Sequence, residues 1–224
     1  MISALIFDFD GLILDTETPE FEVWRDVYRE FGQDLSIETW GQIVGGMDAS
    51  SFRPLPYLQT LTGRDLTPLD LSARAVEQSR ARIVAQPPLP GVLATLRAAR
   101  RLGLRLAVAS SSTHRWVDEH LARLGLTHFF EAVKCSDDVS RTKPEPELYL
   151  SALDALGVSP GEALAFEDSP NGVTAARRAG LFVVAIPNPV TAQLTFEGEC
   201  LRLTSMADLA LEALLADMRD LPQP

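Results

Sequence analysis

The chain has 224 residues, 46% of them hydrophobic and 23% charged, which is typical of a folded globular protein and too apolar for an intrinsically disordered one. Its 20 basic and 31 acidic residues give a formal net charge of −11, which argues against a protein that binds the nucleic-acid backbone through clustered Lys and Arg. At about 150 residues per domain, the length suits one large domain with an insert, or two small domains.

Cysteine usage and hydropathy give no sign of a disulfide framework, a zinc site or a membrane anchor. Cys135 and Cys200 stand far apart, with no CxxC pattern and no Cys/His cluster, so we expect two reduced thiols. No window approaches 18 apolar residues, and no basic N-terminal region precedes a long apolar run. We expect a cytoplasmic protein, a monomer or homodimer, without nucleic-acid or membrane partners.

The first predicted element is a buried strand over residues 4–7. The run Ala-Leu-Ile-Phe is short and wholly apolar, which is typical of a parallel sheet that is covered on both faces. It continues into Asp8-Phe9-Asp10-Gly11, and an Asp-Gly pair between apolar runs is also a signal for a hairpin turn. This segment alone does not distinguish a hairpin from a strand that ends in a functional loop.

Asp8 and Asp10 are candidate ligands for a divalent cation. Residues two apart in an extended chain face the same side. Two carboxylates about 4 Å apart repel each other by about 4 kcal/mol at an effective dielectric constant of about 20. Near a buried sheet edge they need protons or a cation in order to coexist, and a pair of oxygen ligands suits Mg²⁺.

The segment that follows, up to about residue 88, is predicted to be mainly helical. Apolar and aromatic residues recur at helical spacing after residue 20, and Ser36 and Thr67 are placed as helix N-caps, with Pro68 in the first turn. The expected helices span residues 20–31, 36–44 and 67–85. The proline cluster at residues 86–90 predicts a boundary.

Beyond this boundary the pattern changes to regular α–β alternation with short loops. The expected helices are 90–101, 114–124, 147–156 and 171–179, and the expected strands are 104–109, 132–134, 163–166 and 182–186. A further strand near 200–203 and a helix over 206–218 are expected in the C-terminal tail. Such alternation predicts an α/β fold, with a Rossmann-like parallel sheet and helices on both faces.

The sequence therefore predicts two units. Residues 1–16 and 89–224 form the α/β core, and residues 17–88 form a small all-helical cap domain inserted into it. The natural position for the insert is over the carboxyl ends of the strands, where open α/β sheets bind their ligands.

Polar side chains follow four of the predicted strands or loops. They are Asp8 with Asp10, Ser110 with its neighbours Ser111 and Ser112, Lys143, and Glu167 with Asp168. Each has a simple structural explanation when taken alone: the serines can cap the next helix, Lys143 can be solvated, and the last acidic pair can precede a helix capped by Ser169. Together they supply acids for a metal, a hydroxyl and an ammonium for a phosphoryl group, and a carboxylate nucleophile.

These residues resemble the motifs of the haloacid dehalogenase (HAD) superfamily, in the branch with a helical cap after the first motif. The motifs occur in order and span most of the chain: Asp8-Phe9-Asp10-Gly11 with Asp15-Thr16, then Ser110, then Lys143-Pro144, then Glu167-Asp168-Ser169. Any one of them is weak evidence, whereas the full ordered set is specific.

The resemblance implies a role for each residue. Asp8 would attack phosphorus to give an aspartyl-phosphate, and Asp10 would protonate the leaving oxygen and then activate water. Ser110, Ser111 and Lys143 would bind the phosphoryl oxygens. Mg²⁺ would be held by the side chains of Asp8 and Asp168 and the backbone carbonyl of Asp10, with Glu167 assisting through water.

Within the superfamily, the residues favour a phosphatase. Dehalogenases lack the second aspartate and the metal, and phosphonate-cleaving members need a cap lysine, which residues 17–88 do not contain. Sugar-phosphate mutases share all four motifs but need a cationic cap to hold a bisphosphate. Here the first cap helix opens with acids, and the loop 45–53 carries one cation and one acid: Glu17, Glu20 and Glu22, then Arg53 and Asp48.

We therefore expect a Mg²⁺-dependent phosphatase of a small phosphorylated metabolite, such as a sugar phosphate. A sugar-phosphate mutase similar to β-phosphoglucomutase is the alternative. A phosphorylated receiver module is a third possibility, since receivers also combine acids, Ser/Thr and Lys on an α/β sheet. It is disfavoured because the nucleophile candidate Asp8 lies on the first strand beside the other acid, and a cap is inserted.

Overall fold

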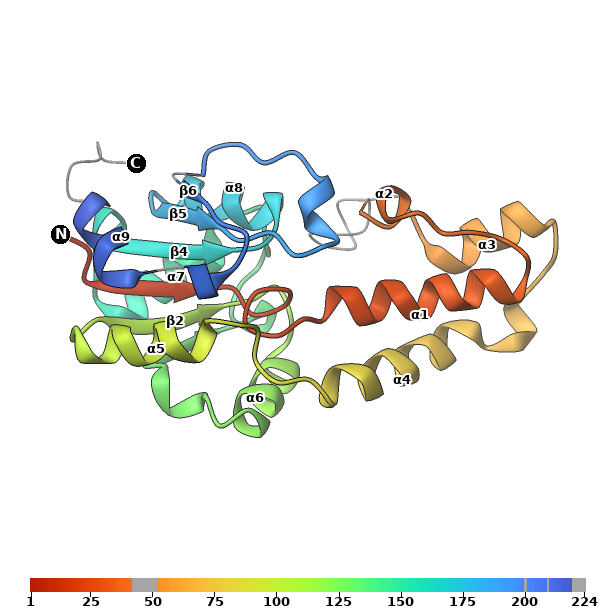
Figure 1. The fold of residues 1–224 in the computed structure, drawn as a ribbon, viewed down its shortest axis with the longest axis horizontal. Coiled ribbons are helices and arrows are strands. Elements are labelled where there is room, and N and C mark those ends of the chain that lie inside the picture. Colours follow the sequence, from red (N-terminus) through yellow and green to blue (C-terminus); the bar gives the residue numbers. More distant parts are fainter. Residues whose placement is uncertain (42–51, 200, 209, 219–224) are drawn as a thin grey trace.

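The computed structural model describes residues 1–41, 52–199, 201–208 and 210–218, and its centre is a parallel six-stranded sheet. The strand order is β3-β2-β1-β4-β5-β6, and every neighbouring pair is parallel (Figure 1). The strands are β1 Ala4–Phe7, β2 Arg105–Ala109, β3 Ala132–Lys134, β4 Ala163–Glu167, β5 Phe182–Ala185 and β6 Leu201–Arg202. The expected Rossmann-like sheet is confirmed. The hairpin at Asp8–Gly11 is excluded because, in the part of the chain that the structure describes, β1 pairs in parallel with β2 and β4 and not with the residues after Gly11.

The order of the strands reverses between β1 and β4. Strands β1 to β3 extend the sheet in one direction, and β4 to β6 extend it in the other. Open α/β sheets bind ligands at such a reversal, just beyond the carboxyl ends of the strands. The residues that follow β1 and β4 therefore occupy the position at which a ligand is expected.

Alternation along the strands sends different side chains to the two faces of the sheet. One face presents large residues such as Phe7, Val108 and Phe166 to helices α5, α6 and α9. The other presents mostly alanines, such as Ala107 and Ala165, to α7 and α8, and these small side chains allow close helix packing. The helices are α5 Val92–Arg101, α6 His114–Arg123, α7 Glu147–Leu156, α8 Pro170–Arg178 and α9 Leu211–Asp217.

A separate group of helices lies beyond the carboxyl edge of the sheet (Figure 1). It contains α1 Glu17–Glu30, α2 Ile37–Trp40, α3 Pro54–Thr62 and α4 Leu71–Val84. Helix α1 leaves the sheet edge and α4 returns to it alongside, and Arg82 of α4 pairs with Glu22 and Asp26 of α1. A buried apolar cluster lies among these helices, with Tyr28, Trp40 and Leu58 among its largest members, and Val190 from the segment after β5 also belongs to it.

Several expected helix ends differ from the structure. Residues 67–69 form only a 3₁₀ turn, and α4 begins at Leu71, after Asp70 in a left-handed conformation (φ 48°). The C-terminal helix is likewise split, into a 3₁₀ turn at Met206–Asp208 and α9. Helix α1 begins before residue 20, because the Asp15 carboxylate accepts the backbone N–H of Thr18 at 3.0 Å.

The remaining predictions about helices and strands have mixed outcomes, and some of them fall on residues that the structure does not describe. Ser36 does cap α2, since its hydroxyl accepts the N–H of Thr39, whereas α3 was not predicted. The expected helix end at Val44 and the expected strand start at Cys200 fall outside the residues that the structure describes. In the described parts of the chain, none of the helices has the length and apolar character needed to cross a membrane.

Candidate active site

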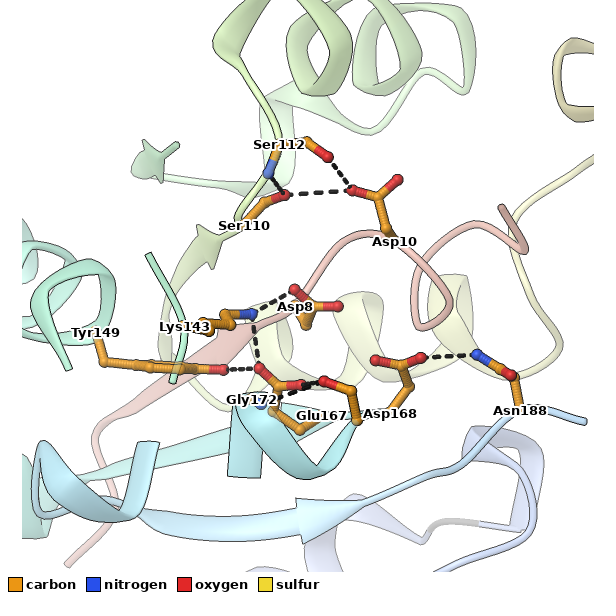
Figure 2. Close-up of polar contacts among 11 residues, drawn as sticks. Asp8, Asp10, Ser110, Ser112, Lys143, Tyr149, Glu167, Asp168, Gly172 and Asn188 are labelled. Atoms are coloured by element: carbon orange, nitrogen blue, oxygen red, sulfur yellow. Dashed lines mark hydrogen bonds and ion pairs between the residues drawn. The ribbon is translucent and has the colours of Figure 1, made fainter. Parts of the chain in front are cut away.

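Three carboxylates meet at the point where the strand order reverses. Phe7 of β1 pairs with Phe166 of β4, so the residues that follow them, Asp8 and Glu167, leave the two strands side by side, and Asp168 comes next. Ligand oxygens of the three acids lie within 4.8 Å of one another (Figure 2). Their exposed fractions are only 6%, 0% and 2%. This is the convergence expected from parallel strands, whose carboxyl ends share one edge.

Lys143 is the cation of this cluster. Its Nζ lies 2.5 Å from Oδ1 of Asp8 and 2.6 Å from Oε1 of Glu167, and its side chain is buried. One ammonium does not balance three buried carboxylates. Carboxylate oxygens are the ligands that hard divalent cations prefer, so the donor set fits a metal ion.

Burial and the mutual charges of this cluster shift the pKa values of its members. Burial raises the pKa of Asp8 to about 7, although Lys143 opposes the shift. Burial, together with Asp8 and Glu167, raises the pKa of Asp168 well above its ordinary value. Burial alone would lower the pKa of Lys143, but Asp8 and Glu167 outweigh it and raise that pKa. Lys143 is therefore charged at neutral pH, whereas the pKa values of Asp8 and Asp168 are raised.

Glu167 is held in place by protein groups on both of its oxygens. Oε1 accepts hydrogen bonds from Lys143 and from the hydroxyl of Tyr149 on α7, and Oε2 accepts a weaker one, at 3.4 Å, from Ser169. Ser169 also caps α8, as the sequence predicted, because its Oγ accepts the N–H of Gly172. A Cβ at Gly172 would lie 1.8 to 2.1 Å from the carboxyl group of Glu167, so this approach requires glycine.

We expect Tyr149→Phe to destabilise the fold. The substitution removes a hydrogen bond to a buried carboxylate, which contributes about 1.5–3 kcal/mol to the free energy of unfolding. Tyr57→Phe is the matched control, because Tyr57 is 38% exposed, and its change should stay within about 0.5 kcal/mol. Urea unfolding of both variants measures the difference, and equal effects would contradict the assigned contact.

Asp10 has a different set of partners from Asp8. Its Oδ2 accepts from Ser112 Oγ at 2.7 Å and, more weakly, from Ser110 Oγ at 3.4 Å, and its Oδ1 accepts from Trp116 Nε1 at 2.8 Å. These donors lie in or just before α6, so the carboxylate is turned toward that helix (Figure 2). The carboxylate of Asp10 is not one of the three grouped acids, although both aspartates line the same cavity.

The predicted site residues converge on one cavity of about 590 Å³. Its lining includes six of them, namely Asp8, Asp10, Ser110, Ser111, Lys143 and Asp168. Glu167 lies behind this wall, fully buried. Helices α1 and α4 complete the cavity on the side away from the sheet, with residues that include Glu17, Glu20, Val76, Ser79 and Arg80.

Sequence reasoning missed several residues of this site. Ser112 was noted only as a neighbour of Ser110, yet it makes the shorter contact with Asp10. Nothing in the sequence distinguishes Trp116, Tyr149 or Asn188 from ordinary core residues. Each reaches the site only through contacts between distant segments, such as the hydrogen bond from Trp116 to Asp10 across 106 positions.

Comparisons with known proteins identify the family of this chain. The family model described as haloacid dehalogenase-like hydrolase matches residues 5–186. The chain belongs to this family. YhcW of Bacillus subtilis, named as a candidate phosphatase, is 49% identical over 215 residues, which cover 96% of this chain and 97% of that protein. This HAD-like hydrolase is therefore an enzyme, and its relatives include a protein named as a candidate phosphatase.

Two further comparisons concern phosphorylated sugars. A Thermotoga maritima protein named phosphorylated carbohydrates phosphatase is 33% identical and covers 80% of this HAD-like hydrolase and 82% of its own length. A crystal structure titled as a candidate β-phosphoglucomutase, also from Thermotoga maritima, superimposes with a TM-score of 0.75 at 28% identity. It covers 96% of this chain and 99% of its own. The neighbours of this hydrolase thus include proteins named for phosphatase and for mutase activity.

Proposed function

We propose that the protein is a Mg²⁺-dependent phosphatase of a small phosphorylated carbohydrate. The observation that carries the proposal is the buried group of Asp8, Lys143 and Asp168, which opens onto a cavity that Asp10 also lines. A nucleophilic carboxylate, a fixed cation and a second acid that can move a proton are the groups that phosphomonoester hydrolysis needs. The phosphatase names of the relatives support the same activity.

In this proposal Asp8 attacks phosphorus and the bond to the leaving alcohol breaks, giving an aspartyl-phosphate. Asp10 donates its proton to the leaving oxygen, and it then accepts a proton from the water that attacks the aspartyl-phosphate. Lys143, Ser110 and Ser111 bind the phosphoryl oxygens. The hydrogen bonds from Ser112 and Trp116 to Asp10 hold its carboxyl group in place during both proton transfers.

The carboxylates fit a metal ion, and we propose Mg²⁺. Asp8 and Asp168 would hold it together with the backbone carbonyl of Asp10, and Glu167 would assist through water. When bound, it neutralises charge on the phosphoryl group so that a carboxylate can approach. The division into a core of residues 1–16 and 89–224 and a cap of residues 17–88 belongs to the same proposal, with the cap closing over the phosphoryl group.

The cavity wall favours hydrolysis over the mutase alternative. Among the lining residues that the structure describes, the cations are Lys143 and Arg80, and Arg80 already holds Glu119 with contacts of 2.8 and 2.9 Å. Burial raises the pKa of Glu17 to about 8, and it also raises that of Glu20. These carboxyl groups supply no positive charge that could hold a second phosphoryl group, whereas sugar hydroxyls can hydrogen-bond to them. Residues 45–51 of the cap loop lie outside the described residues.

A direct assay separates the two activities. The protein is incubated with Mg²⁺ and a hexose 1-phosphate, with and without a hexose bisphosphate primer, and free phosphate and hexose 6-phosphate are measured. We expect one free phosphate for each hexose released, in both conditions, and loss of turnover with EDTA. Formation of hexose 6-phosphate without free phosphate would show that the protein is a mutase and not a phosphatase.

The raised pKa values predict that Mg²⁺ binding depends on pH. Asp8 has a pKa of about 7 and the pKa of Asp168 is raised, so protons compete with the metal for these carboxylates. The apparent affinity for Mg²⁺ should therefore fall as the pH is lowered from 8 to 6, and the fall should approach about tenfold per pH unit for each proton displaced once the pH is below the pKa of that group. Calorimetric titrations in buffers of different ionisation enthalpy report the released protons. An affinity that does not change with pH would contradict the prediction.

A further inference from the structure

Asp168 has a buried partner from outside the four motifs. Asn188 follows β5, and its Nδ2 donates to Oδ2 of Asp168 at 2.7 Å. The exposed fraction of Asn188 is 7%. Figure 2 shows this amide on one side of Asp168, while the other carboxylate oxygen is turned toward Asp8 and Glu167. The hydrogen bond thus occupies the oxygen that faces away from the acidic cluster.

The orientation of the Asn188 amide is set by its own turn. Its Oδ1 accepts the backbone N–H groups of Val190 and Thr191, at 2.9 and 3.0 Å. The amide NH₂ is consequently left to face Asp168. The backbone N–H of Asn188 donates to Oγ1 of Thr191, and this hydrogen bond closes the turn. Rotating the amide would leave two buried N–H groups without an acceptor, so Asn188 presents a fixed donor.

The first motif covers this hydrogen bond. Gly11 has a φ of 79°, and a Cβ there would lie 2.3 Å from Oδ2 of Asp168 and 2.6 Å from Nδ2 of Asn188. Only a glycine backbone can pass this close. The contact between Asp168 and Asn188 is therefore enclosed by the turn that carries Asp10, and water has little room to replace the amide.

We propose that Asn188 is a positioning residue for the metal site: it fixes Asp168 so that the free carboxylate oxygen faces Asp8. The inference rests on the proposed metal site. Groups that hydrogen-bond to a metal ligand typically change metal affinity or activity by about 10–100-fold when they are removed. We expect an effect of this size on Mg²⁺ affinity, with a much smaller effect on kcat once Mg²⁺ is saturating.

Two substitutions in the same turn separate positioning from folding. Asn188→Ser keeps a side-chain oxygen that can accept the N–H groups of the turn, but it is too short to reach Asp168. Thr191→Val removes the hydroxyl that closes the turn and leaves the Asn188 amide in place. If Asn188 had a purely structural role, both variants should lose Mg²⁺ affinity to a similar extent. The proposal predicts that only Asn188→Ser weakens Mg²⁺ binding.

The test is calorimetric titration of the 224-residue protein with MgCl₂ alone, beside thermal unfolding without added metal. We expect a dissociation constant about 10–100-fold higher for Asn188→Ser, and one within about threefold of wild type for Thr191→Val. Asn188→Ala serves as a second variant if the serine variant does not fold. The inference would be overturned if the folded Asn188 variant bound Mg²⁺ as tightly as wild type. It would also be overturned if Thr191→Val lost as much Mg²⁺ affinity as the Asn188 variant.

Asp168→Asn distinguishes failure of the inference from failure of the proposed function. If wild type binds Mg²⁺, Asp168→Asn does not, and Asn188→Ser binds like wild type, the metal site stands and the role of Asn188 is wrong. If wild type shows no Mg²⁺ binding, or Asp168→Asn binds as tightly as wild type, the proposed metal site is wrong and the inference falls with it.

Discussion

Asp8→Asn should reduce kcat by about four orders of magnitude or more, because a neutral amide cannot attack phosphorus and losses of this size follow removal of a nucleophile. The side chain keeps its shape, and Lys143 keeps Glu167 as an ionic partner at 2.6 Å. Burial also raises the pKa of Asp8 to about 7, so the neutral amide resembles a form that the folded protein already tolerates. We therefore expect Asp8→Asn to remain folded.

The matched control for this variant is Asp154→Asn on α7. Asp154 is exposed, so the same chemical change there should leave kcat within about twofold of wild type, as is usual for surface substitutions. Phosphate release from p-nitrophenyl phosphate in the presence of Mg²⁺, together with circular dichroism of each variant, measures both properties. An Asp8→Asn enzyme that keeps activity within tenfold of wild type would remove Asp8 as the nucleophile.

Lys143→Met should impair both catalysis and folding. Without the ammonium, the phosphoryl group loses a fixed cation, and loss of such a group lowers kcat by about 10²–10³. The substitution also leaves Asp8, Glu167 and Asp168 together without their cation. Breaking a buried ion pair by removing one partner lowers the free energy of unfolding by about 3–5 kcal/mol. Added Mg²⁺ should recover part of this stability if it binds these carboxylates as proposed.

Lys134→Met provides the comparison, because Lys134 is the other lysine of the chain and lies at the end of β3, outside the cavity lining. The activity of Lys134→Met should remain within about twofold of wild type, as is usual for substitutions away from the site. Urea unfolding with and without Mg²⁺ reports stability, and phosphate release reports turnover. If Lys143→Met were as stable and as active as Lys134→Met, the central position of Lys143 in the site would be wrong.

The cavity also suggests where substrate selectivity arises. Strand ends and the first turn of α6 supply the groups around the proposed phosphoryl position, whereas α1 and α4 supply the opposite wall. Arg80 on that wall is tied to Glu119 on α6, which links the helical segment to the core beside the cavity. Changes in α1 and α4 can therefore alter the leaving group that fits without altering the groups that act on phosphorus.

Much of the fold could be predicted because its signals are local. The apolar run Ala4–Phe7 and the α–β alternation after residue 90 predict buried parallel strands, and Ser36 and Ser169 cap helices as expected. Helix ends were less predictable where two local signals compete. Thr67 and Pro68 suit a helix start, but the chain makes a 3₁₀ turn there and begins α4 only after Asp70.

The sequence by itself determined the order of the elements and the residue types at the strand ends, because both depend on neighbours within a few positions. Only the tertiary structure decided which side chains complete the site. Tyr149 reaches Glu167, Asn188 reaches Asp168 and Trp116 reaches Asp10 because the sheet order brings their segments to one edge. These buried or half-buried carboxylates need hydrogen-bond donors, and which donor is within reach depends on packing between elements that are distant along the chain.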